Sequence, residues 1–232
     1  VPEKKVPPTG SSFKDQIGGL REVFSSLTFW RVAPLTTLSQ ATFLSVQGLW
    51  AGPWLRDVAG LDRMAVASTL MWTAAAMVVG FAFLGALAQR LARLGFGTEK
   101  TAVIGMAAFN GIQVLLILEL VRWALPIWIL YGFIGTTGII SYAALSQSFP
   151  VHLSGRVNTS VNLLVFISAF VGQWLIGGII EIWPVAADGH YDPRGYRAGF
   201  AIMSVLQLMS LIWYFLAVWL TRRKRLGTRK IG

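Results

Sequence analysis

The sequence contains no cysteine, two histidines and few charged residues. Without Cys, the chain can form neither disulfides nor thiolate metal sites. His152 and His190 lie in connections that we predict on opposite sides of a membrane, so they cannot share a metal ion or form a catalytic dyad. Charged residues make up 13% of the chain, against about 25% in a typical soluble domain. These shortages argue against an enzyme, and no cofactor motif or metal-ligand set is visible.

The chain is rich in apolar residues and carries a net positive charge. Hydrophobic residues make up 55% of it, Trp occurs ten times, and the formal net charge is +10. Such a charge is common in nucleic-acid-binding proteins, but here the basic residues lie in short connections between apolar runs and form no basic face. We therefore predict an integral membrane protein whose partner is the lipid bilayer, with no nucleic-acid partner.

Charged residues divide the chain into six uncharged windows of 18 to 33 residues. The windows lie between Arg31 and Arg56, Arg63 and Arg90, Lys100 and Glu119, Arg122 and Arg156, Arg156 and Glu181, and Arg197 and Arg222. A membrane-spanning helix needs about 20 apolar residues, so each window can span the bilayer, the longest with a turn around Phe149 and Pro150. The predicted fold is all-α, with a bundle of six transmembrane helices over residues 29–221.

Residues 1–28 are predicted to form a cytoplasmic linker with an amphipathic helix. Residues 1–10 are charged and Pro-rich, which is typical of a linker. Over 11–28, apolar residues recur at helical spacing, which suits a helix in the membrane interface: Phe13, Ile17, Leu20, Phe24 and Leu27. An ordinary surface helix fits the same pattern. Residues 222–232 are predicted to be a basic cytoplasmic tail.

Lys and Arg are distributed unequally between the connections, which predicts the orientation. One side collects the linker and the tail, together with Arg90, Arg93, Lys100 and Arg156. On the other side, the Arg residues are largely matched by Asp and Glu. We therefore expect both termini in the cytoplasm and the chain in the cytoplasmic (inner) membrane.

A short basic stretch, Gly85–Leu94, separates the second window from the third. Its spacing resembles the G-x-L-a-D-R-x-G-R-K signature of the major facilitator superfamily (MFS), with matches at Gly85, Leu87, Ala88, Arg90 and Arg93. Gln89 stands where the family has Asp, and Ala92 stands where it has its second Gly. Departures of this kind fit the weakened copy of the signature that the family carries between helices eight and nine.

The resemblance implies the C-terminal six-helix half of an MFS transporter, built as two three-helix inverted repeats. Its partner would be the N-terminal six-helix half of the same transporter. The loop residues Gly85, Gln89, Arg90 and Arg93 would then act as a conformational latch. The first helix of each triplet is irregular in sequence: Gly48, Gly52 and Pro53 interrupt one, and Pro126, Gly132, Gly135 and Gly138 the other.

Polar side chains form stripes on the first and fourth predicted spans. In lipid such a stripe packs against another helix or lines a cavity, and the family's first and fourth helices line the central cavity. The resemblance therefore assigns substrate-binding candidates: Thr36, Gln40, Gln47, Trp50, Tyr131, Thr137 and Tyr142. Small and polar residues that join helices would give the same stripes, and we interpret Asn110, Gln113, Asn158 and Asn162 in this way.

The function expected from these features is secondary transport of a small organic solute by alternating access. Gln, Thr, Tyr and Trp side chains suit a neutral or aromatic substrate. Arg31 is interpreted as an interface anchor whose charged end reaches water; turned inward, it would attract an anion. The alternative is a self-contained six-helix channel or membrane scaffold, although the paired Asn-Pro-Ala loops of an aquaporin are absent from the sequence.

Overall fold

The computed structural model describes the backbone of residues 13–228 and the side chains of residues 18–223. The linker residues 1–12 and the last residues of the tail, 229–232, lie outside the described residues. The described chain is helical and contains no β-strand. Its elements are α1 (Phe13–Ser25), α2 (Leu27–Ser45), the π-helical segment η1 (Val46–Trp50), α3 (Ala51–Asp57), α4 (Arg63–Arg93), α5 (Thr98–Ile117), the 3₁₀ turn η2 (Val121–Trp123), α6 (Ala124–Gly135), α7 (Gly138–Gln147), α8 (Val151–Ile180) and α9 (Pro193–Thr228).

Five helical stretches of the described chain are long and apolar enough to cross a membrane. They are Arg63–Arg93, Thr98–Ile117, Val121–Gln147, Val151–Ile180 and Pro193–Arg223, and they match five of the six predicted windows. The predicted turn around Phe149 and Pro150 is confirmed between α7 and α8. The chain is therefore a membrane-embedded helical protein.

The first predicted window folds as α2, η1 and α3, and it is not among the five stretches. The reason is its position in the middle of the bundle. Of the 19 residues of α2, 11 are buried, and five of these are Ser or Thr. A helix surrounded by protein can carry hydroxyl groups that bond to neighbouring backbone, whereas a lipid-facing helix must be apolar around most of its circumference.

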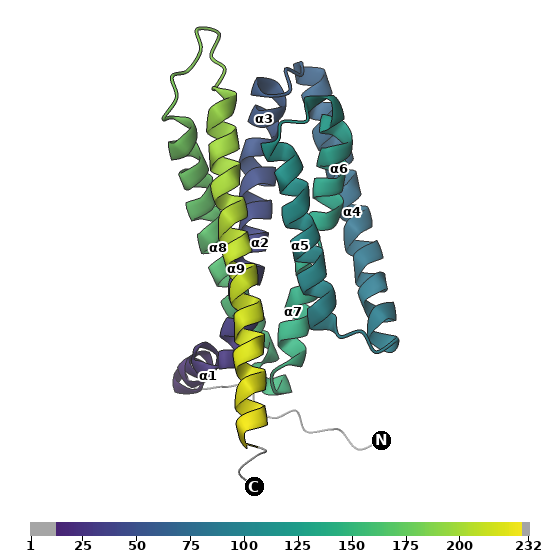
Figure 1. The fold of residues 1–232 in the computed structure, drawn as a ribbon, viewed down its shortest axis with the longest axis vertical. Helices are drawn as coiled ribbons and strands as arrows, with labels where there is room; N and C mark the ends of the chain where they lie inside the picture. Colours follow the sequence, from purple (N-terminus) through teal and green to yellow (C-terminus); the bar gives the residue numbers. More distant parts are fainter. Residues whose placement is uncertain (1–12, 229–232) are drawn as a thin grey trace.

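The remaining helices surround α2 in an order that differs from their order in the chain. α2 packs mainly against α8 and α9, while α4 packs mainly against α6. α5 contacts α6, α7 and α9. Two buried apolar clusters fill the bundle, one toward each end. Figure 1 shows the helices other than α1 running nearly along the long axis, while α1 lies across it at the same end of the bundle as the end of α9.

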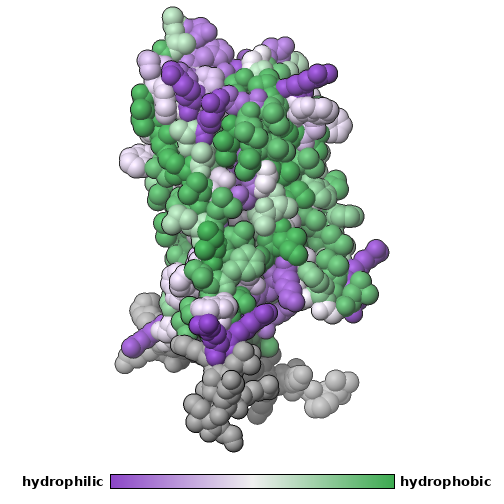
Figure 2. All heavy atoms as spheres, viewed as in Figure 1, coloured by the Kyte–Doolittle hydropathy of each residue, from purple (hydrophilic) through white to green (hydrophobic). Residues whose placement is uncertain are grey.

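The sides of the bundle are apolar and its ends are polar. Figure 2 shows a broad hydrophobic band over the middle of one face, with hydrophilic residues gathered at the two ends. Large apolar side chains point outward within the apolar stretches, such as Phe170 (73% exposed) and Trp174 (75% exposed) on α8. Lipid tails can cover such side chains at little free-energy cost, since both are apolar.

Reciprocal amide bonds join α5 to α9 inside the apolar band. Gln113 donates to the Gln207 side-chain oxygen (3.0 Å), and Gln207 donates back to Gln113 (2.9 Å). One turn away, the Asn110 amide donates to the backbone carbonyl of Ser204 (3.0 Å). The interpretation of Asn110 and Gln113 as helix-joining groups is thereby confirmed.

The amphipathic N-terminal helix is present as α1. It packs on α8 and on the start of α2, with Val23 fully buried and Gly19 against the Arg156 side chain. The Trp30 indole N–H donates to the Phe24 carbonyl (2.7 Å), which fixes the corner between α1 and α2. At the other terminus α9 continues to Thr228, so the predicted tail begins as a helical extension of the last span.

Candidate functional site

The first helix of each predicted triplet is interrupted within the bundle, but in opposite ways. In η1 the helix widens, and the Ala51 N–H donates to the carbonyl of Val46, five residues back. Pro53 accounts for this, because it has no N–H to bond to Leu49 and its ring crowds that carbonyl in a regular α-helix. Single π-helical turns of this kind are frequent at functional sites.

The second interruption, at Thr136 and Thr137, tightens the helix between α6 and α7. The Ile139 N–H donates to the Thr136 carbonyl (3.1 Å), three residues back, in place of the α-helical bond to Gly135. The Thr136 hydroxyl also donates to the Phe133 carbonyl (2.7 Å), which competes with the regular backbone pattern. The Gly135 carbonyl is therefore released from the helix ladder.

The two interrupted helices meet at this released carbonyl. The Gln40 side-chain amide donates to the Gly135 carbonyl (3.1 Å), and any side chain at Gly138 would overlap Gln40. A few residues away, the Tyr131 hydroxyl donates to the Thr42 carbonyl (3.3 Å). The glycines that the sequence places in the fourth span thus permit close approach of α2, whose side-chain amide replaces the missing backbone bond.

The seven substrate-binding candidates fall into three groups. Gln40, Tyr131 and Thr137 lie around the α6–α7 interruption, and Thr36 is buried nearby on α2 with its hydroxyl bonded to its own helix. Gln47 and Trp50 belong to η1, and the Trp50 indole donates to the Gln173 carbonyl on α8 (3.2 Å). Tyr142 lies further along α7 and donates to the side-chain oxygen of Asn162 on α8 (3.4 Å).

Each interruption holds one buried polar atom that has no hydrogen-bond partner in the described structure. These are the Gln47 side-chain oxygen in η1 and the Thr137 hydroxyl at the α6–α7 interruption. A buried polar group without a partner destabilises a protein by about 1–3 kcal/mol. Both groups belong to the predicted candidate set, and both are able to bond to a ligand.

The predicted latch residues lie at the end of α4 nearest α1. Gly85 is half-buried, whereas Gln89, Arg90 and Arg93 are exposed. The helix ends with Gly95 at a positive φ of 83°. Within residues 18–223, neither Arg90 nor Arg93 forms an ion pair, so these charges are available to a molecule outside the described chain.

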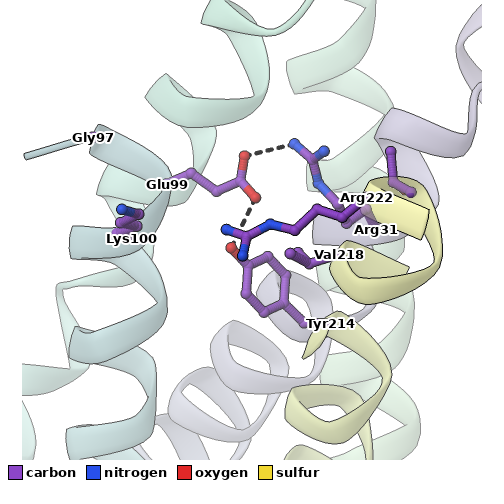
Figure 3. A pocket seen from close by; sticks show the side chains of 8 residues that line it. Arg31, Gly97, Glu99, Lys100, Tyr214, Val218 and Arg222 are labelled. Carbon is purple, nitrogen blue, oxygen red and sulfur yellow. Dashed lines mark hydrogen bonds and ion pairs between the residues drawn. The ribbon is translucent and has the colours of Figure 1, made fainter. Parts of the chain in front are cut away.

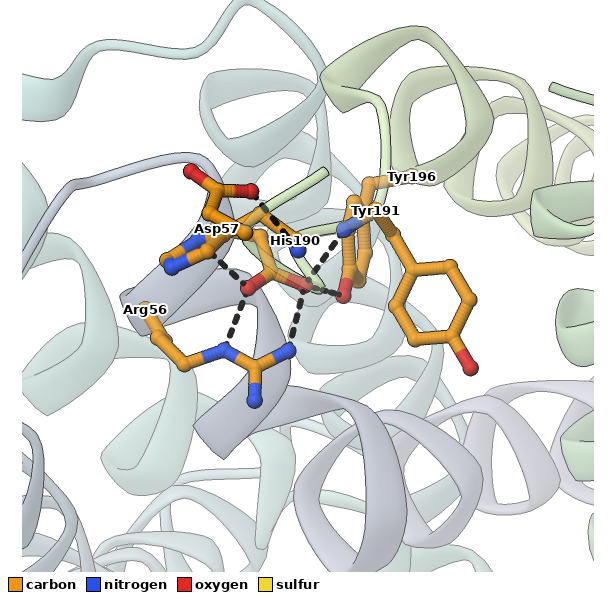
Figure 4. Close-up of polar contacts among 6 residues, drawn as sticks. Arg56, Asp57, His190, Tyr191 and Tyr196 are labelled. Carbon is orange, nitrogen blue, oxygen red and sulfur yellow. Dashed lines mark hydrogen bonds and ion pairs between the residues drawn. The ribbon is translucent and has the colours of Figure 1, made fainter. Parts of the chain in front are cut away.

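At the end of the bundle remote from α1, the Asp57 carboxylate is the centre of a polar cluster (Figure 4). Its fully buried side chain accepts hydrogen bonds from Arg56, from the Tyr196 hydroxyl (2.6 Å) and from the Tyr191 backbone N–H (3.3 Å), and His190 Nδ1 lies 3.1 Å from it. These five residues, the Asp57 cluster, attach the α8–α9 connection to the end of α3. Arg197 pairs with Glu119 (2.6 Å) and joins α9 to the end of α5.

Burial and hydrogen bonding act in opposite directions on Asp57, which lies beyond the apolar window that ends at Arg56. Burial raises the pKa of the carboxyl group, but hydrogen bonds from Arg56, Tyr196 and Tyr191 outweigh it, so the pKa is lowered from its usual 3.8. The carboxylate form is therefore the one that the folded structure stabilises. No sequence pattern had singled out Asp57.

At the opposite end of the bundle, Glu99 links three helices, α2, α5 and α9. Glu99 at the beginning of α5 accepts from Arg31 on α2 (2.6 Å) and from the Tyr214 hydroxyl on α9 (2.9 Å). The Arg31 guanidinium turns toward α5 and pairs with this carboxylate, with its side chain 23% exposed, so the role of Arg31 as an interface anchor stays a prediction. The pairing was not visible from the sequence, since 68 positions separate the two residues.

Comparison with known proteins adds no assignment to this geometry. No known protein family matches the sequence, and no curated protein matches it.

Proposed function

We propose that this chain is the C-terminal six-helix half of an MFS-type secondary transporter, which moves a small organic solute across the cytoplasmic membrane by alternating access. The observation that carries the proposal is the pair of helix interruptions, at η1 and at Thr136–Thr137. Each lies in the first helix of its triplet, and each holds a buried polar atom without a partner. In transporters, discontinuous helices in corresponding positions of two repeats form the substrate site near the bilayer midplane.

The packing order supports an inverted repeat. The first triplet is α2–α3, α4 and α5, and the second is α6–α7, α8 and α9. The first helix of each triplet packs on the second helix of the other, as α2 on α8 and α6 on α4. The third helices, α5 and α9, pack on each other. A two-fold exchange of the triplets maps the α2–α8 contact onto the α6–α4 contact and the α5–α9 contact onto itself. A simple up-and-down bundle would instead pack chain neighbours most extensively.

The polar surface of α7 and α8 supports a missing partner. Tyr142 is half-buried and Asn162 is exposed, and their hydrogen bond lies within the membrane-spanning stretches. Ser146 and Asn158 form a second such pair (2.8 Å) closer to the α1 end. Lipid tails offer no partner for the remaining amide groups. We infer that the N-terminal half covers this surface and that the two halves rock about a shared central site.

The orientation and the latch follow from the same arrangement. α1 and the end of α9 lie at one end of the bundle, and the excess of Lys and Arg there supports a cytoplasmic position for that end. Arg90 and Arg93, exposed at the same end, would contact acidic groups or helix ends of the partner half. In this proposal they hold one of the two conformations of the transporter at the cytoplasmic side.

A second candidate is a self-contained channel or scaffold. This candidate is favoured by polar side chains that already bond inside the bundle. The Gln40 amide and the Tyr131 hydroxyl both donate to backbone carbonyls there. Proteoliposomes that contain residues 1–232 alone distinguish the two. A half-transporter should move no solute, because one wall of the site is missing, whereas a channel should conduct.

The proposal is tested on the full-length transporter with a panel of neutral and aromatic solutes in proteoliposomes. Gln47→Ala and Thr137→Val each remove one partnerless polar group, and each should raise the apparent KM for the transported solute about 3- to 10-fold, the worth of one hydrogen bond. Thr73→Val is the matched control, because the buried Thr73 hydroxyl bonds to the Thr69 carbonyl of its own helix (2.8 Å) and Thr73 is not among the candidates, and its KM should stay within about twofold. Unchanged KM in both test variants would show that the two interruptions do not form the substrate site.

A further inference from the structure

A polar pocket opens at the α1 end of the bundle, between α2, α5 and α9. Its volume is about 300 Å³, enough for a phosphate group with a few bridging waters, since one water occupies about 30 Å³ in the liquid. Figure 3 shows its side chains converging from three helices. The pocket is lined by Arg31, Gly97, Glu99, Lys100, Tyr214, Val218, Thr221 and Arg222.

The charges of this pocket are unbalanced. Three cationic side chains line it against a single carboxylate, and Glu99 is already bonded to Arg31 and Tyr214. Lys100 and Arg222 are exposed, and neither forms an ion pair among the described side chains, 18–223. The Arg31 Nε atom is buried and has no hydrogen-bond partner in that part of the chain. The pocket is therefore left with a surplus of positive charge and of N–H donors.

Aromatic residues place the pocket at the depth of lipid headgroups. The Trp213 indole donates to the Trp30 carbonyl (2.7 Å), and the Arg223 guanidinium lies 4.0 Å from the centre of the Trp219 ring. All three Trp side chains are between 39% and 49% exposed. Trp gathers where a bilayer changes from hydrocarbon to headgroup, so a pocket flanked by these residues faces the phosphate layer.

We propose that this pocket, formed by Arg31, Lys100 and Arg222 around Glu99, is a binding site for a phosphate ester, such as the headgroup of an anionic phospholipid presents. Lys100 and Arg222 would contact the phosphate oxygens, and Arg31, held in position by Glu99, would supply the further donor. Charge-assisted bonds to phosphate are the strong ones, and basic pockets between helices at the membrane surface bind anionic headgroups. The bound group would tie the ends of α2, α5 and α9 together.

The test measures thermal unfolding of the full-length protein in nanodiscs of phosphatidylcholine alone and with increasing phosphatidylglycerol. Phosphatidylglycerol should stabilise the protein. In the double variant Lys100→Gln/Arg222→Gln, half-saturation should need an about 30-fold higher mole fraction of phosphatidylglycerol. This shift follows from about 1 kcal/mol per basic residue, at about tenfold in affinity per 1.4 kcal/mol. Arg90→Gln/Arg93→Gln is the matched control, because it removes the same charge from exposed positions at the same end. The control should titrate like the unaltered protein.

A parallel titration with soluble glycerol 3-phosphate in phosphatidylcholine nanodiscs identifies the source of the ligand. Stabilisation by phosphatidylglycerol alone assigns the site to lipid, and stabilisation by glycerol 3-phosphate that Lys100→Gln/Arg222→Gln abolishes assigns it to a free phosphate ester. The proposal is overturned if neither ligand stabilises the protein, or if the test and control variants lose stabilisation equally, since the effect would then be general surface charge.

Discussion

The two ends of the bundle each hold one carboxylate at the centre of a polar cluster, but the clusters differ in balance. The Asp57 side chain is fully buried and accepts hydrogen bonds from Arg56, Tyr191 and Tyr196, with His190 beside it. Glu99 is 25% exposed and is bonded by Arg31 and Tyr214, while further cations line the same pocket. At the Asp57 end the carboxylate is bonded by the donors that surround it. At the Glu99 end, donors and positive charge remain for another molecule.

The largest expected contrast between the ends is their accessibility from outside the cell. The chain has no Cys, so a single introduced cysteine reports one position. Asp188→Cys, near the Asp57 cluster, should react fully with a membrane-impermeant maleimide in intact cells, and Lys100→Cys should not react until the cells are opened. Both positions are exposed in the structure. Labelling of the Lys100→Cys protein in intact cells would reverse the orientation of the two ends.

The difference in burial predicts a large stability effect at Asp57. Asp57→Asn keeps the shape but removes the charge, and it should lower the free energy of unfolding by about 2–3 kcal/mol, because bonds to a buried charged group are lost. Thermal unfolding in detergent measures this loss. Asp192→Asn in the same connection is the control, since among the described residues the Asp192 side chain bonds only to the nearby Arg194, close to the surface, and it should change stability much less than Asp57→Asn does. Equal losses in the two variants would contradict the role given to burial.

Glu99→Gln should destabilise the protein less than Asp57→Asn does, and it should strengthen anion binding. The ion pair with Arg31 is about a quarter exposed on both sides, so its loss should lower the free energy of unfolding by about 1 kcal/mol. Removing the one carboxylate among the described residues that line the pocket raises the positive charge of the pocket. The same variant should therefore saturate with phosphatidylglycerol at a lower mole fraction than the unaltered protein, as nanodisc titration would show. Weaker binding would mean that Glu99 positions Arg31 more than it repels the ligand.

The sequence predicted the helices better than it predicted these clusters. Spacing of charges located five apolar spans, and Gly48, Pro53, Gly135 and Gly138 indicated which helices are interrupted. Such features are local, because a helix length or a missing N–H depends on neighbouring residues only. The hydrogen-bonded pairs in these clusters are not local: Asp57 and Tyr196 are 139 positions apart in the sequence. Their contact depends on helix order and register, which periodicity does not specify.

The candidate site was predictable in part for the same reason. The polar stripes on the first and fourth spans include Gln40 and Tyr131, and the structure brings both to the place where α2 meets α6–α7. The sequence did not show that the Gln40 amide bonds within the bundle. Its partner, the Gly135 carbonyl, becomes available only because the helix is interrupted between α6 and α7. The substrate-binding role of Gln47 and Thr137 stays a prediction.

The Asp57 cluster also predicts how acid should affect the stability of its end of the bundle. A lowered pKa means that the carboxylate contributes its stabilisation fully above the unfolded-state value of about 3.8, and that this contribution falls as pH drops through the still lower folded-state pKa. The stability difference between the unaltered protein and Asp57→Asn should therefore be constant from about pH 7 to pH 5 and shrink below about pH 4. His190 lies beside the carboxylate, so both proteins are compared in a His190→Asn background, which removes titration of the imidazole. Thermal unfolding across this pH range measures the difference, and a gap that closes near neutral pH would show that the folded structure raises the pKa of Asp57.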